Sequence, residues 1–290
     1  MVAYRWDSAV LDRTYGFWAW ISCWLDATTK WRLVGRARST LGAMMTLKTS
    51  QEVRDPEFGV SVLGQFRLLR GMNVVRIPRA SQRLLAFLAL HGRIVERTAL
   101  AGALWPEASE PHAYCSLRAA LSRLQSTARM ALAASQLELG LAEGVTVDIH
   151  HAKALARRLL APAVPLVPGD LGTSAVMALS ADLLPDWYDD WVLVEAEDWR
   201  QLRLHALEAL AGHLTAAGRW GEAAGAARAA VRGEPLRETS HAALIQVFLA
   251  EGNVSEAVRE FTSYRALLQD ELGLEPTPRL YHLIQNARNT

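Results

Sequence analysis

The sequence predicts an α+β domain followed by an all-α domain. Between Phe58 and Ile149, short runs of alternating or β-branched apolar residues are interspersed with amphipathic helical patterns. Beyond residue 150, helical periodicity continues with one Pro/Gly-rich interruption, "APAVPLVPGDLG". The second half also contains a repeat with a period of 34 residues, which is typical of packed helix–turn–helix units. A length of 290 residues is compatible with two domains.

Composition indicates a folded chain with an uneven charge distribution. Hydrophobic residues make up 51% of it and charged residues 21%, so it can bury real cores. Residues 1–56 carry a net charge of +3, residues 57–150 of +3 and residues 151–290 of −5. A basic module followed by an acidic one fits a polyanion-binding domain joined to a protein-contacting domain. Cys23 and Cys115 show no metal-ligand spacing, which indicates a reducing cytosol, and we expect a cytoplasmic protein.

The first 45 residues lack a clear helical or strand periodicity. Their apolar run "GFWAWISCWL" has about half the roughly 20 residues that a membrane-spanning helix needs. Asp7 and Asp12 do not suit a signal peptide. We interpret residues 1–56 as an extension outside the folded core, compatible with an over-called start codon, since Met44 and Met45 precede the first clear strand. A partner-binding arm and a membrane anchor are the alternatives, and we expect no membrane attachment.

The α+β part begins with a predicted hairpin. "VSVLGQFRLLR" and "VVRIP" are strand-like and flank Gly71-Met72-Asn73. Ser81 is then expected to cap a helix that ends at His91. A short strand at Ile94-Val95 and a helix from Thr98 to Trp105, closed by Pro106, follow.

After the loop "PEASEP", the pattern predicts one long helix from His112 to Met130. A second hairpin is expected from "QLELGL" and "VTVDI" around Ala142-Glu143-Gly144. The order helix, turn, helix, hairpin predicts a winged helix-turn-helix domain over residues 57–150.

The all-α part, residues 151–290, is predicted to contain tetratricopeptide-like repeats. Leu210, Gly218 and Ala223 recur 34 residues later as Leu244, Gly252 and Ala257. The stretch "LLPDWYDDW" precedes the first repeat and gathers three carboxylates among aromatic rings. We interpret it as a capped helix start, with Asp186 as the N-cap and the two tryptophans anchoring the helix against a neighbouring domain or repeat.

The sequence offers little enzyme chemistry. It contains no phosphate-binding loop, dinucleotide fingerprint, nucleophile elbow or metalloprotease motif. "DIHH", residues 148–151, is interpreted as a helix cap rather than a metal site, and Cys115 as a packing residue rather than a nucleophile. We therefore expect no catalytic residue, no metal and no cofactor.

The predicted long helix is the best candidate for a binding surface. Leu117, Leu121 and Leu124 form one stripe that must face the core. The opposite face is slim, with basic edges, and suits a DNA major groove. The candidate DNA-binding residues are Ser116, Arg118, Ala119, Ser122, Arg123, Gln125 and Arg129.

Four longer stretches resemble the Streptomyces antibiotic regulatory protein family. They are "VSVLGQFRLLRG", "ALAGALWPEASEPHAYCSLRAALSRLQ", "LLPDWYDDWVLVEAEDWRQLRLHALEALA" and "EPLRETSHAALIQVFLAEGNVSEAVREFTSYRALLQDELGLEPTPRL". The resemblance covers about residues 57–290. It implies an OmpR-type winged helix, the type of output domain found in two-component phosphorelays, fused to a bacterial transcriptional activator domain of tetratricopeptide-like helices.

The resemblance also implies roles for single residues. Ser122-Arg123-Leu124 matches the centre of an OmpR-type recognition helix, which implies that Ser122 and Arg123 contact DNA. Gln125 stands where the family often has a second arginine, and the expected wing has no Arg or Lys between Gln136 and Asp148. The loop with Glu107, Ser109 and Glu110 matches the loop that faces RNA polymerase in OmpR-type activators.

These observations predict a sequence-specific transcriptional activator of a secondary-metabolite (antibiotic) gene cluster. We expect it to bind direct repeats of double-stranded DNA as a homodimer and to recruit RNA polymerase holoenzyme. The alternative is a protein-interaction adaptor with a degenerate winged helix on a tetratricopeptide scaffold. An enzyme that uses the aspartate cluster is the third hypothesis.

Overall fold

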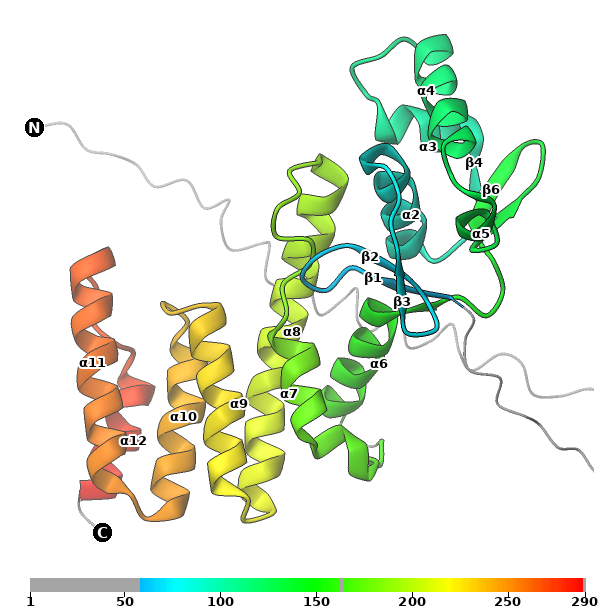
Figure 1. Ribbon diagram of the computed structural model, residues 1–290. Coiled ribbons are helices and arrows are strands. Elements are labelled where there is room, and N and C mark those ends of the chain that lie inside the picture. The colour runs from blue at the N-terminus through cyan, green and yellow to red at the C-terminus, as the bar shows by residue number, and fades with distance from the viewer. Residues whose placement is uncertain (1–57, 162–163, 289–290) are drawn as a thin grey trace, which may run out of the picture. The chain divides into compact units, whose positions relative to one another are not determined.

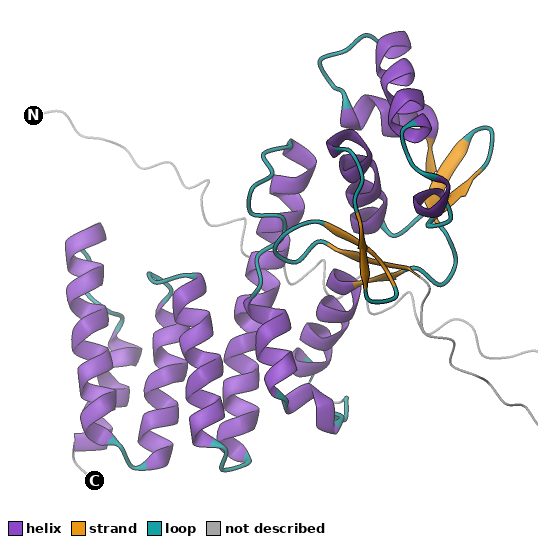
Figure 2. Cartoon of the chain, viewed as in Figure 1, coloured by secondary structure: helices purple, strands orange, loops and turns teal. Residues whose placement is uncertain are grey.

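The computed structural model describes residues 58–161 and 164–288 (Figure 1). The interpretation of residues 1–56 as an extension lies outside the described residues. Within them, a mixed α/β part with two small sheets precedes an all-helical part (Figure 2). The predicted fold class, an α+β domain followed by a helical domain, is confirmed. Among the described helices, none is both long and apolar enough to cross a bilayer.

The first sheet contains the first of the described residues. Its strand order is β3-β2-β1-β7, in which β1 pairs with β2 and β2 with β3 in antiparallel fashion, and β1 with β7 in parallel. Gly71, with φ of +54°, makes the turn between β2 and β3 at the predicted place. The strands are Phe58–Ser61 (β1), Arg67–Arg70 (β2), Asn73–Val75 (β3) and Thr146–Val147 (β7).

Helix α2, Arg79–His91, starts two residues before the predicted cap. Pro78 occupies the N-cap position, where its extended backbone and missing N–H are tolerated. Ser81 is fully buried inside the helix, and its Oγ donates to the carbonyl of Ala120 at 2.8 Å. The prediction of Ser81 as the cap was wrong because a tertiary partner takes the hydroxyl. Helix α3 spans Arg97–Leu104 and ends before Pro106, as expected.

The predicted single helix from His112 to Met130 is two helices. Helix α4 spans Glu110–Ser122 and α5 spans Ser126–Arg129. Gln125 has an extended backbone, with φ of −61° and ψ of 156°, and this break turns the chain. The turn lets Leu124 and Ala128 both enter the core, where they are 2% and 0% exposed. Continuous helical periodicity does not reveal such a turn, because both apolar positions also suit an unbroken helix.

The predicted hairpin between residues 136–141 and 145–149 was also wrong. The wing consists of β5, Leu132–Ala134, and β6, Glu138–Leu141, with β4, Val95–Glu96, paired to the other edge of β6. The Oγ of Ser135 accepts from the N–H groups of Leu137 and Glu138, which closes the turn between β5 and β6. Strand β7 belongs to the first sheet instead. Strand β5 reads "LAA" and carries no alternation that would have predicted it.

The helical part is a series of antiparallel helices. Helix pairs α8/α9 and α10/α11 form the two copies of the predicted repeat, with Gly218 and Gly252 in left-handed conformation at their turns. Helix α9 is alanine-rich and buries its alanines where the helices pack closely. The elements are α6 (Asp148–Leu160), the 3-10 helix η2 (Pro168–Leu171), α7 (Thr173–Ser180), α8 (Asp190–Ala216), α9 (Trp220–Gly233), α10 (Glu238–Glu251), α11 (Val254–Leu272) and α12 (Pro278–Arg288).

The aspartate- and tryptophan-rich stretch joins the two parts of the fold. Trp187 is buried, with its ring centroid 6.0 Å from that of Phe66, and the rings of Trp191 and Phe87 form a T-shaped contact with centroids 5.1 Å apart. Asp189, not Asp186, holds the position before the first turn of α8, and its carboxylate pairs with Arg83 on α2. The nonapeptide is therefore an aromatic joint, and its predicted N-cap is corrected by three residues.

Candidate nucleic-acid interface

Helix α4 presents a narrow exposed face beside a buried one. Ala113, Leu117 and Ala120 are buried, and the bond from Ser81 to the carbonyl of Ala120 ties this buried face to α2. The predicted residues Arg118 and Ser122 are exposed on the outer face. The predicted leucine stripe is borne out in part: Leu117 is buried within α4, Leu121 is half-buried, and Leu124 is buried but lies beyond the end of the helix.

The turn between α4 and α5 brings an arginine from seven residues further along the chain back to the end of α4. Arg129 lies on α5, and its Nη2 donates to the backbone carbonyl of Ser122 at 2.9 Å. The last carbonyls of a helix have no partner inside it, and a cation there also complements the helix dipole. Arg129 therefore closes α4 as a C-terminal cap and places its positive charge beside Ser122. The predicted long helix would have put Arg129 nearly two turns away from Ser122.

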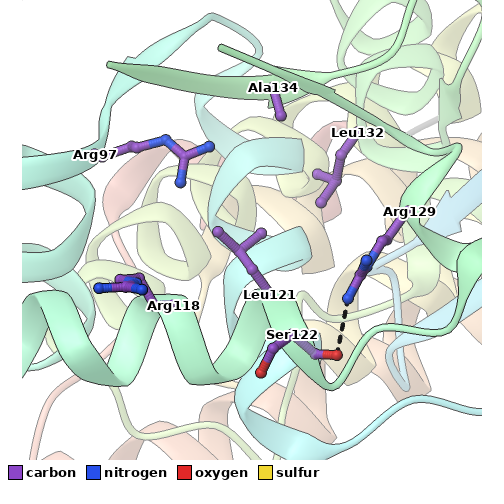
Figure 3. A pocket seen from close by; sticks show the side chains of 7 residues that line it. All are labelled: Arg97, Arg118, Leu121, Ser122, Arg129, Leu132 and Ala134. Atoms are coloured by element: carbon purple, nitrogen blue, oxygen red, sulfur yellow. Dashed lines mark hydrogen bonds between the residues drawn. The ribbon is translucent and has the colours of Figure 1, made fainter. Parts of the chain in front are cut away.

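A hollow of about 360 Å³ lies between the end of α4 and the wing (Figure 3). Three arginines line it, with no acidic residue among the lining side chains. Figure 3 shows Leu121 at its centre, with Arg97 and Arg118 on one side and Arg129 on the other. The lining residues are Arg97, Arg118, Leu121, Ser122, Arg129, Leu132 and Ala134. Three guanidinium groups around an open hollow suit a phosphate, because each can donate in a planar fork.

Arg97 is the residue that the sequence did not point to. Its Nε and Nη2 donate to the carbonyl of Ser135 at 3.1 and 2.7 Å, and its backbone N–H donates to the carbonyl of Leu137 at 2.8 Å. Arg97 is the first residue of α3, yet these bonds attach it to the wing turn. The wing carries no Arg or Lys between Gln136 and Asp148, so Arg97 supplies the positive charge at this place. The pairing of β4 with β6 creates this proximity, and no local pattern reveals it.

The other predicted DNA-binding residues lie outside the hollow. Ser116 and Ala119 are half-buried on α4, while Arg123 and Gln125 are exposed at the corner between α4 and α5. Leu124, expected in the core, is buried there. The structure thus brings Arg118, Ser122 and Arg129 into one hollow and leaves Arg123 and Gln125 beside it.

The loop before α4 and the first residue of that helix are exposed and acidic. Glu107, Ser109 and Glu110 all face solvent, and the Oγ of Ser109 lies 2.7 Å from Nδ1 of His112. A small cavity of about 160 Å³, lined by Trp105, Ala108 and Glu110 among others, lies beneath this loop. The loop is accessible to a partner, and the expected contact with polymerase remains a prediction.

The "DIHH" motif has a structural role. The carboxylate of Asp148 accepts from the Oγ of Ser61 at 2.6 Å and from the N–H groups of Val62 and Leu63. Burial lowers the pKa of His150, and its ring lies against Gly92. Among the described residues, no group of three or more His, Cys, Asp or Glu side chains is arranged to hold a metal ion.

Comparison with known proteins identifies the helical part. Residues 147–288 match the family described as the bacterial transcriptional activator domain. The chain is 28% identical over 239 residues to the regulatory protein AfsR of Streptomyces griseus, which covers 78% of this chain and 24% of AfsR. It is 29% identical over 248 residues to AfsR of Streptomyces coelicolor, covering 77% of this chain and 23% of AfsR. The chain therefore carries a bacterial transcriptional activator domain and is a distant relative of AfsR, of whose length it spans about a quarter.

The fold as a whole is similar to that of EmbR of Mycobacterium tuberculosis, solved in complex with a low-affinity phosphopeptide. The superposition has a TM-score of 0.62 at 24% identity, and covers 80% of this chain and 65% of the EmbR chain. This likeness agrees with the predicted order of a mixed α/β part followed by an all-helical part.

Proposed function

We propose that this chain, which carries a bacterial transcriptional activator domain, is a sequence-specific DNA-binding transcriptional activator. In this proposal, residues 57–150 form the DNA-binding domain and residues 151–290 the domain that contacts other proteins. The AfsR proteins are named as regulatory proteins, which supports a regulatory role for this chain.

The three-arginine hollow is the observation that carries the proposal. Arg97, Arg118 and Arg129 come from three different helices and converge on one open space without a carboxylate. Guanidinium groups arranged in this way suit the phosphate backbone of a duplex, which dominates the affinity of most DNA-binding proteins. The adjacent face of α4 is slim enough to approach base edges, since Ser116, Ala119 and Ser122 have short side chains.

Sequence reading is assigned to the residues beside the hollow. Arg123 and Gln125 are exposed at the corner that follows α4. Both side chains have the donors needed to read base edges, and arginine in particular can bind a guanine through two hydrogen bonds. In this arrangement Arg97, Arg118 and Arg129 position the duplex, and Arg123 and Gln125 specify the sequence.

The biological setting of the proposal follows from the family resemblance. Two copies lie side by side on direct repeats in the major groove, and the loop with Glu107, Ser109 and Glu110 contacts RNA polymerase. The protein acts in the cytoplasm and controls a secondary-metabolite gene cluster. The exposure of all three loop residues supports the contact with polymerase.

A protein-interaction adaptor is the second candidate function. The absence of Lys and Arg from residues 137–147 favours it, because a wing without cations is a poor minor-groove contact. Arg97 offsets this deficit by bonding to the wing turn with its guanidinium.

The experiment that separates the two functions is a selection from a pool of random duplexes at physiological salt, followed by a titration with the enriched sequence. If the chain is a sequence-specific activator, the selection enriches one sequence, and the chain binds that sequence at least about a thousandfold more tightly than a scrambled duplex. If no sequence is enriched while thermal unfolding shows an intact protein, the adaptor assignment replaces the activator.

A further inference from the structure

One stretch of the chain is basic without any acidic counterpart. Residues 58–95 contain six arginines and no Asp or Glu. On the hairpin of β2 and β3, Arg67 and Arg76 are exposed together with Met72 and Val74, which are 96% and 58% exposed. These four residues form what we call the hairpin surface. Exposed apolar side chains among arginines suit a protein partner better than a phosphate backbone, because burying apolar surface in a protein interface lowers the free energy.

A second exposed surface has the opposite charge. It begins in the joint before α8 and follows the outer face of the first two turns of that helix. Positions 190, 193, 194 and 197 fall on one helical face because they are three, four and seven residues apart. We call it the α8 stripe; its exposed residues are Asp186, Tyr188, Asp190, Leu193, Val194 and Glu197. Tyr188 is 80% and Val194 is 65% exposed.

The two surfaces complement each other in charge and in apolar content. We propose that the hairpin surface of one copy of this chain docks on the α8 stripe of the next copy. Both surfaces are exposed in the folded chain, so neither covers the other within one molecule. Contacts of arginine with an aromatic ring and with a carboxylate already occur within the chain, since Arg79 lies over the ring of Trp187 and Arg83 pairs with Asp189.

The proposed contact joins two different surfaces, and this has a geometric consequence. A two-fold symmetric dimer uses the same patch on both subunits and would suit an inverted repeat. A head-to-tail contact instead relates successive copies in the same direction, as direct repeats of DNA require. The inference therefore rests on the proposed function and explains how adjacent copies would cooperate. The interface can be weak in solution, because binding to neighbouring half-sites raises the effective concentration of the partner surface to about the millimolar range.

Charge reversal tests the contact on DNA. The probes are a duplex with one half-site, taken from the selected sequence, and duplexes with two half-sites in direct repeat at spacings around one helical turn of about 10 base pairs. The variants are Arg76→Glu, Asp186→Arg and the double variant. In the double variant, both charges of the contact between adjacent copies are reversed, so the attraction is restored. Arg93→Glu and Asp270→Arg reverse exposed charges outside both surfaces and serve as controls.

We expect wild type to bind the second half-site more tightly than the first, by a factor within the usual range of about 5–150 for coupled sites. Each single variant lowers this factor toward one without changing single half-site affinity or melting temperature, and the double variant recovers it. Unchanged cooperativity in the single variants, or a loss that the double variant does not recover, overturns the inference. A loss of single half-site affinity in Arg76→Glu also overturns the inference, because it would show that the hairpin surface contacts DNA. If wild type binds no half-site, the proposed function itself fails, and the inference with it.

Discussion

The guanidinium of Arg79 lies over the indole ring of Trp187, 3.9 Å from the ring centroid. Arg79 is the first residue of α2, and Trp187 belongs to the joint that precedes α8. One turn further along α2, Arg83 pairs with Asp189 and donates to the carbonyl of Leu104. Two arginines of one helix thus connect the mixed α/β part to the helical part through the aspartate- and tryptophan-rich stretch.

The joint should be worth several kcal/mol of stability. Trp187 is only 4% exposed, so Trp187→Ala should lower the free energy of unfolding by about 3–5 kcal/mol through lost burial and the cavity left behind. Arg79→Ala removes only the contact with the ring and should cost about 0.5–1 kcal/mol. Urea unfolding at pH 7 measures both, with Arg93→Ala as the control at an exposed arginine. An effect of Arg79→Ala that persists in the Trp187→Ala background would contradict the assigned contact.

The phosphate contacts should appear in the salt dependence of DNA binding. Arg97→Ala and Arg118→Ala should each reduce the slope of log K against log salt by about one, for every duplex sequence, because each removes one phosphate contact. Arg97→Lys keeps the charge and should retain most of the slope. Fluorescence anisotropy titrations between about 50 and 200 mM salt measure this. Arg259→Ala on α11, where the side chain is 74% exposed, is the control. If the slope is the same in Arg97→Ala as in wild type, Arg97 makes no phosphate contact.

Substitution of Arg123 should weaken DNA binding in a sequence-dependent way, unlike substitution of the arginines that line the hollow. If Arg123 binds a guanine through two hydrogen bonds, Arg123→Ala should cost about 1–3 kcal/mol on the selected sequence and little on a scrambled duplex. The loss should vanish when one particular base pair of the half-site is also changed. Titrations of wild type and variant against a set of single base-pair substitutions measure it. A uniform loss across the whole set would reassign Arg123 to the DNA backbone.

Glu208 should make the activator domain sensitive to acid. Burial acts to raise its pKa, but hydrogen bonds from His205, Thr239, Arg237 and Ser240 together lower the pKa to about 2. The folded-state pKa lies below the unfolded value of about 4.5, so the contribution is complete above pH 4.5 and is lost as the pH falls toward 2.

Part of the Glu208 carboxylate is open to solvent screening, and we therefore expect about 1–2 kcal/mol of stability to disappear over this range. Glu208→Gln should be less stable than wild type at pH 7, and the two should converge near about pH 2.5. Urea unfolding at several pH values measures the difference, with Glu251→Gln at the exposed end of α10 as the control. A constant difference at all pH values would exclude ionisation of Glu208 as the cause.

Local patterns predicted most of the helices and the first hairpin. Pro106 ended α3 because proline cannot continue a helix, and the Gly218/Gly252 spacing located the turns of the repeat. The same patterns misplaced the wing and the cap of α2. In the wing, β5 has no apolar alternation, yet it pairs with β6 in antiparallel fashion. For α2, the hydroxyl of Ser81 has a partner 39 residues away.

The sequence by itself determined the order of an α+β part and a helical repeat, the burial of Leu117 and Leu124, and the exposure of Arg118 and Ser122. These depend on periodicity and residue type, which act over a few residues. Only the tertiary structure decided that α4 ends at Ser122, that Arg129 returns to its last carbonyl, and that Arg97 bonds to the wing turn. Such contacts join residues separated by a chain turn or by a strand pairing, and the free energy that selects them comes from burying Leu124 and Ala128 and from satisfying backbone carbonyls in the folded core.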